Sequence, residues 1–351
     1  MNRRKTKTLY VGDVAVGGDA PISIQSMNTT DTRDVAATLL QLNQLKEAGC
    51  DISRLAVPDQ EAADALPAIL AASPLPLVAD VHFDYRLAIS AVKAGVQALR
   101  INPGNWRSRD GIIEVARLAK ERGIPIRVGV NSGSLSRSVI DRFGGVTPEA
   151  MAFSALESAA LLTEHGFTDI CLSVKASDPL MMIEANRHLA SQSDLPLHLG
   201  VTEAGTPYEG IIRSSVGIGA LLASGIGDTI RVSLTADPVQ EVKAGRAILK
   251  SLNLTNRGAI LISCPTCGRT QVGLMALAER VERYLEGVRR PLKVAVMGCA
   301  VNGPGEARDA DIGVAGGDGE YLLFSKGAII GKVAETEVFE RLVEEIERLN
   351  A

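Results

Sequence analysis

The sequence predicts a (β/α)8 barrel followed by a small α+β domain. Over roughly the first 250 residues, short apolar segments alternate with helical stretches of ~12 to 18 residues, and eight such units match the usual size of this barrel. After residue 259 the alternation stops, and strand and helix patterns follow one another in a different order. A doubly wound open sheet is the alternative, but it rarely contains eight strands of such regularity.

The eight apolar segments are the predicted barrel strands. They are almost continuously apolar, which is typical of a parallel sheet covered on both faces. A glycine often follows the intervening helix, as in KEAGCDISRLAV and VKAGVQALRINP, and glycine in that place is the usual signal that ends a helix. The strands are predicted at residues 22–27, 51–57, 75–82, 98–103, 124–131, 169–176, 195–202 and 229–235.

The segment KSLNLTNRGA, residues 250–259, breaks this pattern and is predicted to be a linker. The predicted domains are therefore 1–250 and 260–351. In the second, strands are predicted at 259–263, 292–298, 311–316 and within 321–333, and helices at 273–288 and 335–350. The last helix carries an apolar face at helical spacing, made of Phe339, Leu342, Ile346 and Leu349.

The composition is that of an ordinary soluble globular protein. Of 351 residues, 46% are hydrophobic and 22% charged, and the net charge of −4 gives no reason to expect a nucleic-acid partner. No apolar run approaches the ~20 residues of a membrane span, and the basic start MNRRKTKTLYVGD lacks the apolar core of a secretory signal. Five cysteines, an odd number, favour a reducing compartment, which predicts a cytoplasmic location.

The carboxyl ends of the predicted barrel strands are unusually polar, and barrel active sites lie at those ends. Positions two or four apart on one strand point to the same side, so these side chains should meet at the barrel mouth. The polar set is Arg54, Asp80, His82, Arg100, Asn102, Arg127, Asn131, Lys175, Glu203, Arg231 and Ser233.

Five of these side chains are cations, and only Asp80 and Glu203 are acids. Rim salt bridges would explain a single arginine, but burying several cations without partners is costly. The planar guanidinium of arginine and the point charge of lysine suit phosphate oxygens. The mouth is therefore predicted to bind a phosphorylated small molecule, and a diphosphate is favoured. The chain has neither of the glycine-rich phosphate loops of nucleotide and dinucleotide sites.

The remaining barrel thiols and histidines suggest less chemistry. Cys50 and Cys171 stand beside apolar strand residues and are predicted to be core thiols. His198 lies mid-strand, below the mouth, and is predicted to be structural. His82 is the histidine placed for chemistry, at the end of the third strand.

The motif CPTCG contains Cys264 and Cys267, and by itself it is typical of a zinc ribbon. A ribbon needs two more cysteines or histidines, but only Cys299 follows, and all four histidines lie in the barrel. In GCAVNGPGE the candidate fourth ligand is Glu306, which glycine and proline turns could bring back to the metal. Three thiolates and a displaceable carboxylate suit an iron–sulfur cluster with one weakly held, Lewis-acidic iron better than structural zinc.

Motifs from both predicted domains resemble one family of bacterial isoprenoid enzymes. SCPTCGRT and MGCAVNGPGEARDADIGVAGG, with QSMNTTDT, LRINPGN, IRVGVNSGS, LSVKAS and GVTEAG, are similar to segments of the 4-hydroxy-3-methylbut-2-enyl diphosphate synthases of the methylerythritol phosphate pathway. The resemblance covers essentially the whole chain. It implies a barrel plus a [4Fe–4S] domain similar to the half-domains of sulfite reductases, in the two-domain form that lacks the extra domain of plant-type enzymes.

The resemblance also implies roles for individual residues. The ligands of the [4Fe–4S] cluster would be Cys264, Cys267, Cys299 and Glu306. The residues that bind the substrate diphosphate would be Arg54, Arg100, Arg127, Lys175 and Ser233. The polar lining would consist of Asp80, His82, Asn102, Asn131, Glu203 and Asn302.

The implied reaction converts 2-C-methyl-D-erythritol 2,4-cyclodiphosphate into 4-hydroxy-3-methylbut-2-enyl diphosphate by a two-electron reductive ring opening, with flavodoxin or ferredoxin as electron donor. The catalytic candidates are Glu203, Glu306 and His82, and Glu203 is the candidate proton donor to the departing hydroxyl. The competing hypothesis is a phosphate-binding barrel synthase or hydrolase of the pterin-binding type, with a structural zinc domain.

The chain path predicts a head-to-tail homodimer. The last barrel helix, about residues 237 to 250, runs antiparallel to its strand and leaves the barrel opposite the mouth. A linker of ~10 residues reaches at most ~33 to 36 Å, which leaves little slack to place a cluster over the chain's own mouth. A partner's cluster domain could close the mouth instead, as the resemblance also implies; a monomer folded over itself is the alternative.

Overall fold

The computed structural model describes residues 2–102, 108–299 and 307–350. They form two compact units, one that extends to Leu254 and one that begins at Thr255. Within these ranges, no helix combines the length and the apolar character needed to cross a membrane.

The first unit is the predicted (β/α)8 barrel. Its eight strands are parallel and neighbour one another in the order β8-β7-β6-β5-β4-β3-β10-β9, and a bridge between Leu172 and Leu197 closes the ring from β8 to the start of β9. The strands are β3 (Ser23–Met27), β4 (Ile52–Ala56), β5 (Leu77–Val81), β6 (Ala98–Ile101), β7 (Ile126–Asn131), β8 (Ile170–Lys175), β9 (His198–Leu199) and β10 (Thr229–Ile230).

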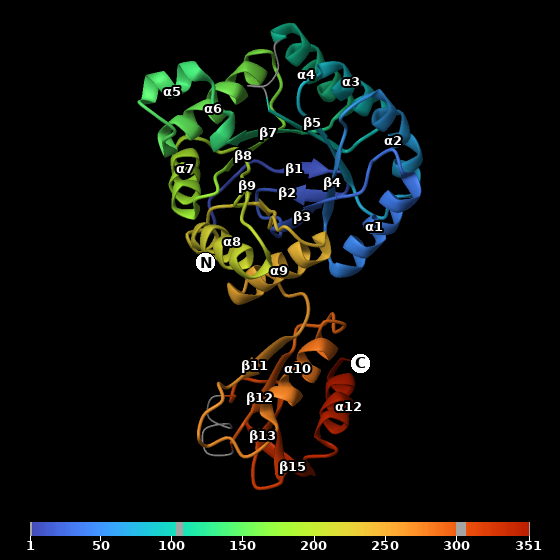
Figure 1. The fold of residues 1–351 in the computed structure, drawn as a ribbon, viewed down its shortest axis with the longest axis vertical. Coiled ribbons are helices and arrows are strands. Elements are labelled where there is room, and N and C mark those ends of the chain that lie inside the picture. The colour runs from blue at the N-terminus through green and yellow to red at the C-terminus, as the bar shows by residue number, and fades with distance from the viewer. Residues whose placement is uncertain (1, 103–107, 300–306, 351) are drawn as a thin grey trace. The chain divides into compact units, whose positions relative to one another are not determined.

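Helices encircle the strands (Figure 1). Their ends follow local signals: Asp34 and Asp59 cap the first turns of α1 and α2, and Gly49 ends α1 in the left-handed conformation, with a φ of 93°. The helices are α1 (Val35–Ala48), α2 (Gln60–Ala72), α3 (Tyr85–Ala94), α4 (Arg109–Arg122), α5 (Arg137–Phe143), α6 (Pro148–Glu164), α7 (Pro179–Gln192), α8 (Pro207–Ala223) and α9 (Pro238–Ser251).

A hairpin that the sequence analysis did not predict forms the floor of the barrel. Its strands β1 (Leu9–Val11) and β2 (Val14–Val16) are antiparallel. Val11 and Val16 pack against Ile52, Val78 and Ala98, which point inward near the starts of their strands. The N-terminal end of the barrel is therefore closed by apolar side chains, and polar chemistry is confined to the interior above them.

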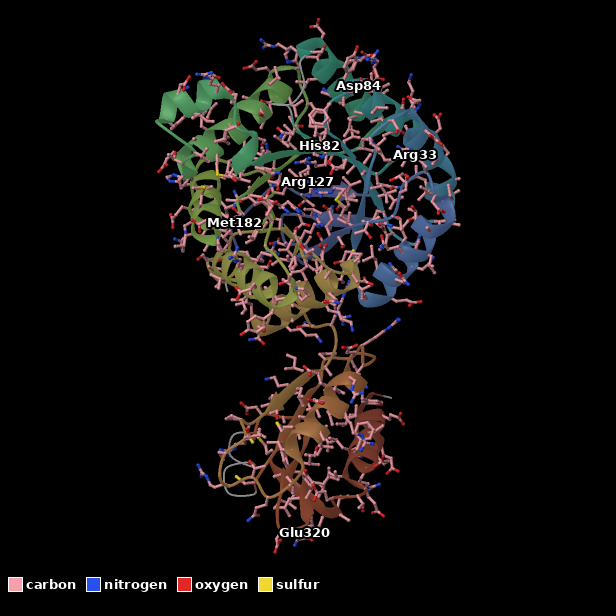
Figure 2. The ribbon with its side chains drawn as sticks, viewed as in Figure 1. Arg33, His82, Asp84, Arg127, Met182 and Glu320 are labelled. Carbon is pink, nitrogen blue, oxygen red and sulfur yellow. The ribbon has the colours of Figure 1, made fainter. Side chains whose placement is uncertain are left out.

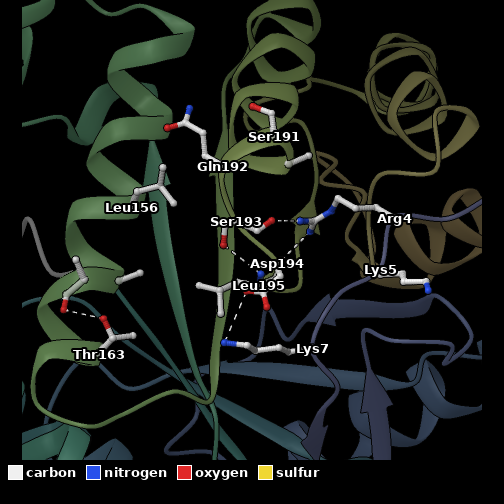
Figure 3. Close-up of a pocket in the computed structure, with 13 residues that line it drawn as sticks. Arg4, Lys5, Lys7, Leu156, Thr163, Ser191, Gln192, Ser193, Asp194 and Leu195 are labelled. Atoms are coloured by element: carbon white, nitrogen blue, oxygen red, sulfur yellow. Dashed lines mark hydrogen bonds and ion pairs between the residues drawn. The ribbon is translucent and has the colours of Figure 1, made fainter.

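The segment before the hairpin, which includes Arg4 and Lys7, binds to the residues that follow α7. Arg4 donates to the carbonyl oxygens of Ser193 and Leu195, and Lys7 pairs with Asp194 at 3.7 Å (Figure 3). These residues line an open pocket of about 660 Å3. Because Arg4 and Lys7 already have protein partners, we interpret this pocket as a structural junction.

The second unit is the predicted α+β domain. Its five-stranded sheet has the order β11-β12-β13-β14-β15; the first three strands are parallel, and the last two join antiparallel. Leu342 and Ile346 of the last helix are fully buried in the core, and Phe339 and Leu349 pack against it, as predicted. The elements are β11 (Ile260–Ser263), α10 (Leu274–Leu285), β12 (Lys293–Met297), β13 (Ile312–Gly316), β14 (Glu320–Ser325), β15 (Ala328–Ala334) and α12 (Val338–Asn350).

Candidate functional site

A layer of charged side chains occupies the barrel interior above the hairpin floor. Adjacent strands place these residues side by side, since Asp80 pairs in register with Arg100, and Arg100 with Arg127. Figure 2 shows Arg127 inside the ring of strands. At most 9% of the surface is exposed in each of Arg54, Asp80, Arg100, Arg127 and Lys175.

Two glycines make room for this layer. A Cβ atom at Gly129 on β7 would lie 2.8 Å from Nε of Arg100. A Cβ atom at Gly200, directly after β9, would lie 2.7 Å from Nζ of Lys175 and 2.4 Å from a backbone oxygen. Both contacts are closer than real Cβ atoms come. A side chain at position 200 would collide with backbone, and one at position 129 would displace the guanidinium of Arg100.

Asp80 is the counter-charge for two of the arginines. Its carboxylate oxygens lie 3.3 Å from Nε of Arg54 and 3.1 Å from Nη1 of Arg100. Nε2 of His82 lies 3.3 Å from the same carboxylate. Burial would raise the pKa of Asp80, but Arg54, the hydrogen bond from His82 and Arg100 together lower this pKa well below its usual range.

Glu241 is the counter-charge for Arg231, and the sequence analysis missed it. This residue lies in the first turn of α9 and is 4% exposed. Its carboxylate accepts from Nε and Nη2 of Arg231 at 3.3 Å each, from Oγ of Ser26 at 3.1 Å and from the backbone N–H of Leu234 at 2.9 Å. The sequence analysis counted only Asp80 and Glu203 as acids near the five cations, and Glu241 adds a third.

Arg127 and Lys175 have no carboxylate partner among the described residues. Nη1 of Arg127 donates to Oε1 of Gln25 at 2.7 Å, while its Nε and Nη2 are buried without a partner in the part of the chain described. Burial, reinforced by Arg100, lowers the pKa of Arg127 to about 10. Burial and then the charge of Arg231 lower the pKa of Lys175 well below its usual range.

The layer thus holds five buried or half-buried cations against two buried carboxylates, Asp80 and Glu241. Two charges that cannot be satisfied by these acids, on Arg127 and Lys175, lie on the adjacent strands β7 and β8. A bound anion would offset both the lost hydration of these buried cations and the repulsion between them, which are the two effects that lower their pKa values. The geometry therefore favours an anionic ligand inside the barrel, near Arg127 and Lys175.

The other predicted mouth residues surround this layer with different exposures. Asn102 is buried, Asn131 and Ser233 are half-buried, and His82 and Glu203 are exposed. Glu203 has a φ of 54°, in the left-handed region that costs a residue with a side chain roughly 1 kcal/mol. Such backbone conformations gather at functional sites, so the position of Glu203 fits its predicted role, which remains a prediction.

In the second unit, the three motif cysteines follow two neighbouring strands. Cys264 comes directly after β11, and Cys299 follows β12 by two residues. Sγ of Cys264 accepts from the backbone N–H of Gly298 at 3.2 Å, which places it beside the residue that precedes Cys299. Cys267 is exposed, and hydrogen bonding to the backbone of Arg269 lowers its pKa, which favours the thiolate.

Thiols are the ligands that hold iron–sulfur clusters, so the residue types of these three cysteines fit such a group. Within the described ranges, no three histidine, cysteine or acidic side chains converge as the ligands of one ion would. The predicted ligand Glu306 and the predicted lining residue Asn302 lie outside the described residues.

Comparison with known families identifies both units. The family model described as the GcpE TIM-barrel domain matches residues 6–246, and the model of the GcpE protein C-terminal domain matches residues 260–348. The chain belongs to the GcpE family. This confirms the family resemblance of the sequence motifs.

Curated relatives of this GcpE chain match it from end to end. A protein of Ruminiclostridium cellulolyticum is 56% identical over 349 residues, which cover 99% of each chain. One of Clostridium tetani is 54% identical and covers 99% of this chain and all of the relative, and one of Corynebacterium jeikeium is 57% identical, covering 99% and 90%. All three are named 4-hydroxy-3-methylbut-2-en-1-yl diphosphate synthase (flavodoxin).

Solved structures of low identity share the fold of the GcpE barrel. A dihydropteroate synthase of Yersinia pestis aligns with a TM-score of 0.50 at 12% identity, over 70% of this chain and 97% of that one. A phospho-2-dehydro-3-deoxyheptonate aldolase of Thermotoga maritima aligns with the same score at 14% identity, over 71% and 72%. At such identities the likeness shows the barrel fold alone, and it gives no support to the pterin-binding hypothesis.

Replacing Asp80 with asparagine tests the charged layer. The change keeps the shape but removes the counter-charge of Arg54 and Arg100, and breaking a buried pair in this way costs about 3–5 kcal/mol. We expect a clear fall in the thermal unfolding midpoint, partly restored by added pyrophosphate. The matched control is Asp64→Asn on the exposed face of α2, which should unfold like the unchanged protein. Equal midpoints for all three proteins would contradict the assignment.

Proposed function

We propose that this GcpE-family chain catalyses the reductive ring opening of 2-C-methyl-D-erythritol 2,4-cyclodiphosphate to 4-hydroxy-3-methylbut-2-enyl diphosphate. The observation that carries the proposal is the end-to-end similarity to relatives with that activity in their names. The reaction takes up two electrons and one proton, breaks the ring carbon–oxygen bond to leave an anionic phosphate oxygen, and releases one hydroxyl as water. The donor named for the relatives is flavodoxin, and we propose the same donor here; the predicted cytoplasmic location is part of the proposal.

The diphosphate of the substrate is held, in this proposal, inside the barrel between Lys175, the last residue of β8, and Arg127, the second residue of β7. Arg127 and Lys175 supply the two positive charges that the protein itself leaves unpaired within its described residues. Arg54 and Arg100 face the same space but share the charge of Asp80. Arg54 and Arg100 add hydrogen-bond donors to the diphosphate. Asn102, Asn131 and Ser233 are predicted to add uncharged hydrogen bonds.

The second unit supports a [4Fe–4S] cluster held by Cys264, Cys267 and Cys299, with Glu306 proposed as the fourth ligand. The lowered pKa of Cys267 favours the thiolate form that iron requires, and the hydrogen bond from Gly298 holds Cys264 beside the residue that precedes Cys299. When bound, such a cluster supplies single electrons and an iron that is open to substrate oxygen.

Glu203 is the proposed proton donor to the departing hydroxyl. It lies four residues beyond the end of β9 and is exposed. His82 touches Asp80 and Arg100 and remains 46% exposed, so it could contact substrate while steadying both partners. An acid close to the reacting oxygen is what general acid catalysis needs.

We propose that the active site is shared between two chains. Helix α9 ends at the floor of the barrel, since Arg246 near its end donates to the carbonyl of Ala48 at the end of α1. Eight residues then separate Ser251 from Ile260. They reach at most about 26–29 Å, and retracing α9 alone uses roughly 21 Å. A head-to-tail dimer, in which each cluster domain serves the partner's barrel, removes this constraint.

Glu306→Ala tests the fourth ligand. Without the carboxylate, one iron should be lost or loosened, so we expect a [3Fe–4S] signal in electron paramagnetic resonance and activity reduced to a few per cent or less. The control is Glu320→Ala, an exposed residue on β14 whose carboxylate pairs with Lys332. A stable [4Fe–4S] cluster and normal turnover in Glu306→Ala would remove this residue from the site.

The experiment that tests the whole function is anaerobic purification with iron and sulfide analysis, followed by turnover of the cyclodiphosphate with reduced flavodoxin. We expect a brown protein with about four irons per chain and formation of the linear diphosphate product. A colourless zinc protein, or a brown protein without turnover under these conditions, would contradict the proposal.

A further inference from the structure

A small cavity with a mainly apolar wall lies inside the barrel, between the hairpin floor and the charged layer. Its volume is about 30 Å3. Apolar residues such as Val11, Val16 and Ile52 form most of its wall, and polar side chains from five strands complete it. These polar residues are Gln25, Arg127, Cys171, His198 and Thr229.

Three of these side chains carry buried polar atoms that have no protein partner among the described residues. They are Nε and Nη2 of Arg127, both ring nitrogens of His198 and Oγ1 of Thr229. Arg127 is 7% exposed, His198 is fully buried and Thr229 is 4% exposed. Buried polar groups are nearly always hydrogen-bonded, to protein or to ordered water. Five such atoms around one cavity therefore point to a ligand within it.

The chemistry of the wall selects the ligand. Arg127 offers only donors, so a metal cation is excluded by charge. A neutral histidine offers one donor and one acceptor nitrogen, and burial together with Arg127 lowers the pKa of His198, which keeps its ring neutral. A simple anion accepts only and would leave the acceptor nitrogen unsatisfied. Water donates and accepts, and about 10–15 Å3 is enough for one molecule.

We propose that this cavity is a buried water site that links His198 and Thr229 to the guanidinium of Arg127. Gln25 holds Nη1 of Arg127 directly, at 2.7 Å, and the water would hold Nε or Nη2 from below. The guanidinium is then fixed before the substrate arrives, with fewer rotamers to lose on binding. His198 and Thr229 are positioning residues for Arg127; this consequence rests on the proposed function of Arg127 in binding diphosphate.

The expected structural result is electron density for one or two waters in the cavity of the unchanged protein, within hydrogen-bond distance of Arg127. His198→Phe fills the space with a ring that offers no hydrogen bond, and it should expel that density. Thr229→Val keeps the shape and removes one hydroxyl, which guards against a folding failure of the first variant.

The functional readout is kinetics of the anaerobic holoenzyme with the cyclodiphosphate. We expect KM to rise about fivefold to tenfold in His198→Phe and Thr229→Val, as for one lost hydrogen bond, with kcat and the cluster absorbance little changed. His198→Gln, which keeps a donor and an acceptor, should recover part of the loss. The control Thr163→Val removes an exposed hydroxyl that bonds the carbonyl of Ala160, and it should leave KM unchanged.

Three outcomes would overturn the proposal. A dry cavity in a high-resolution structure removes the water, and an anomalous bromide peak there after a bromide soak replaces it with an anion site. An unchanged KM in both His198→Phe and Thr229→Val removes the positioning role. The proposed function is judged separately by Arg127→Met: an unchanged KM in that variant refutes the role of Arg127 in substrate binding, while the density still decides the water site.

Discussion

Lys175→Met should weaken binding of the cyclodiphosphate by about tenfold to a hundredfold or more, since a hydrogen bond to a charged group is worth ~1.5–3 kcal/mol. Lys175 is buried, and the described residues give it no acidic partner, so its ammonium is available to the diphosphate. Arg127→Met should have an effect of similar size. The measurement is calorimetric titration of the anaerobic holoenzyme, with the cluster spectrum as a check that the second unit is intact.

The matched control for this titration is Lys46→Met. Lys46 is an exposed residue in the last turn of α1, at the end of the barrel opposite the mouth. Its removal changes the net charge by the same amount without touching the interior, so affinity should change by less than about twofold in ordinary salt. Unchanged affinity in both Lys175→Met and Arg127→Met would mean that the diphosphate binds elsewhere.

The lowered pKa of Lys175 adds a second observable to the same titration. Burial and Arg231, with Arg127, Arg54 and Arg100, disfavour its protonated form in the free protein. A bound diphosphate favours that form, so the pKa rises on binding and the complex takes up protons. Affinity should therefore fall as the pH rises through the pKa of Lys175 in the free protein. Binding heats in buffers of different ionisation enthalpy measure this uptake, and Lys175→Met should abolish it.

The remaining cations are poorer tests because their removal leaves a buried carboxylate without its partner. Loss of Arg54 removes one of the two arginines that pair with Asp80, and loss of Arg231 leaves Glu241 without its arginine, so stability and binding would change together. Lys175 and Arg127 separate the two effects, since no acid depends on them among the described residues. This difference came from the fold, since the sequence alone places all five cations at strand ends on equal terms.

Local signals explain why the barrel could be predicted. Each strand is a short apolar run, and left-handed glycines such as Gly49, Gly95 and Gly123 end the preceding helices. The alternation of side chains along a strand predicted that Asp80 and His82 point to the same side, and in the structure Nε2 of His82 lies 3.3 Å from Asp80. The spacing of apolar residues and the glycines that end helices are features of residues close together in the sequence. They can therefore be recognised without knowledge of distant contacts.

Partners distant in the chain could not be predicted in the same way. Gln25 lies 102 residues from Arg127 in sequence, and only the closure of the barrel brings their side chains to 2.7 Å. Glu241 is an acidic residue in the first turn of a helix, a place where such residues usually serve the helix dipole. The floor hairpin was missed because its strands have three residues each, which is shorter than the periodic patterns that reveal strands.

Mixing two inactive chains should restore activity if the active site is shared. One chain carries Glu203→Gln in the barrel, and the other carries Cys264→Ser in the cluster domain. In a head-to-tail mixed dimer, one of the two sites combines an intact barrel with an intact partner cluster. If subunits exchange at random, half of the dimers are mixed, and activity should recover to about a quarter of that of the unchanged protein.

The control for this experiment is a mixture of two barrel variants, Glu203→Gln and Lys175→Met. Each mixed dimer then has a damaged barrel at both sites, so activity should not rise above the residual activity of the Lys175→Met chain alone, although exchange proceeds equally well. The physical basis is the short connection: eight residues between α9 and β11 must otherwise climb past the full length of α9 to reach the chain's own mouth. Absence of recovery in the first mixture, with heterodimers proven by mass spectrometry, would mean that each barrel uses the cluster of its own chain.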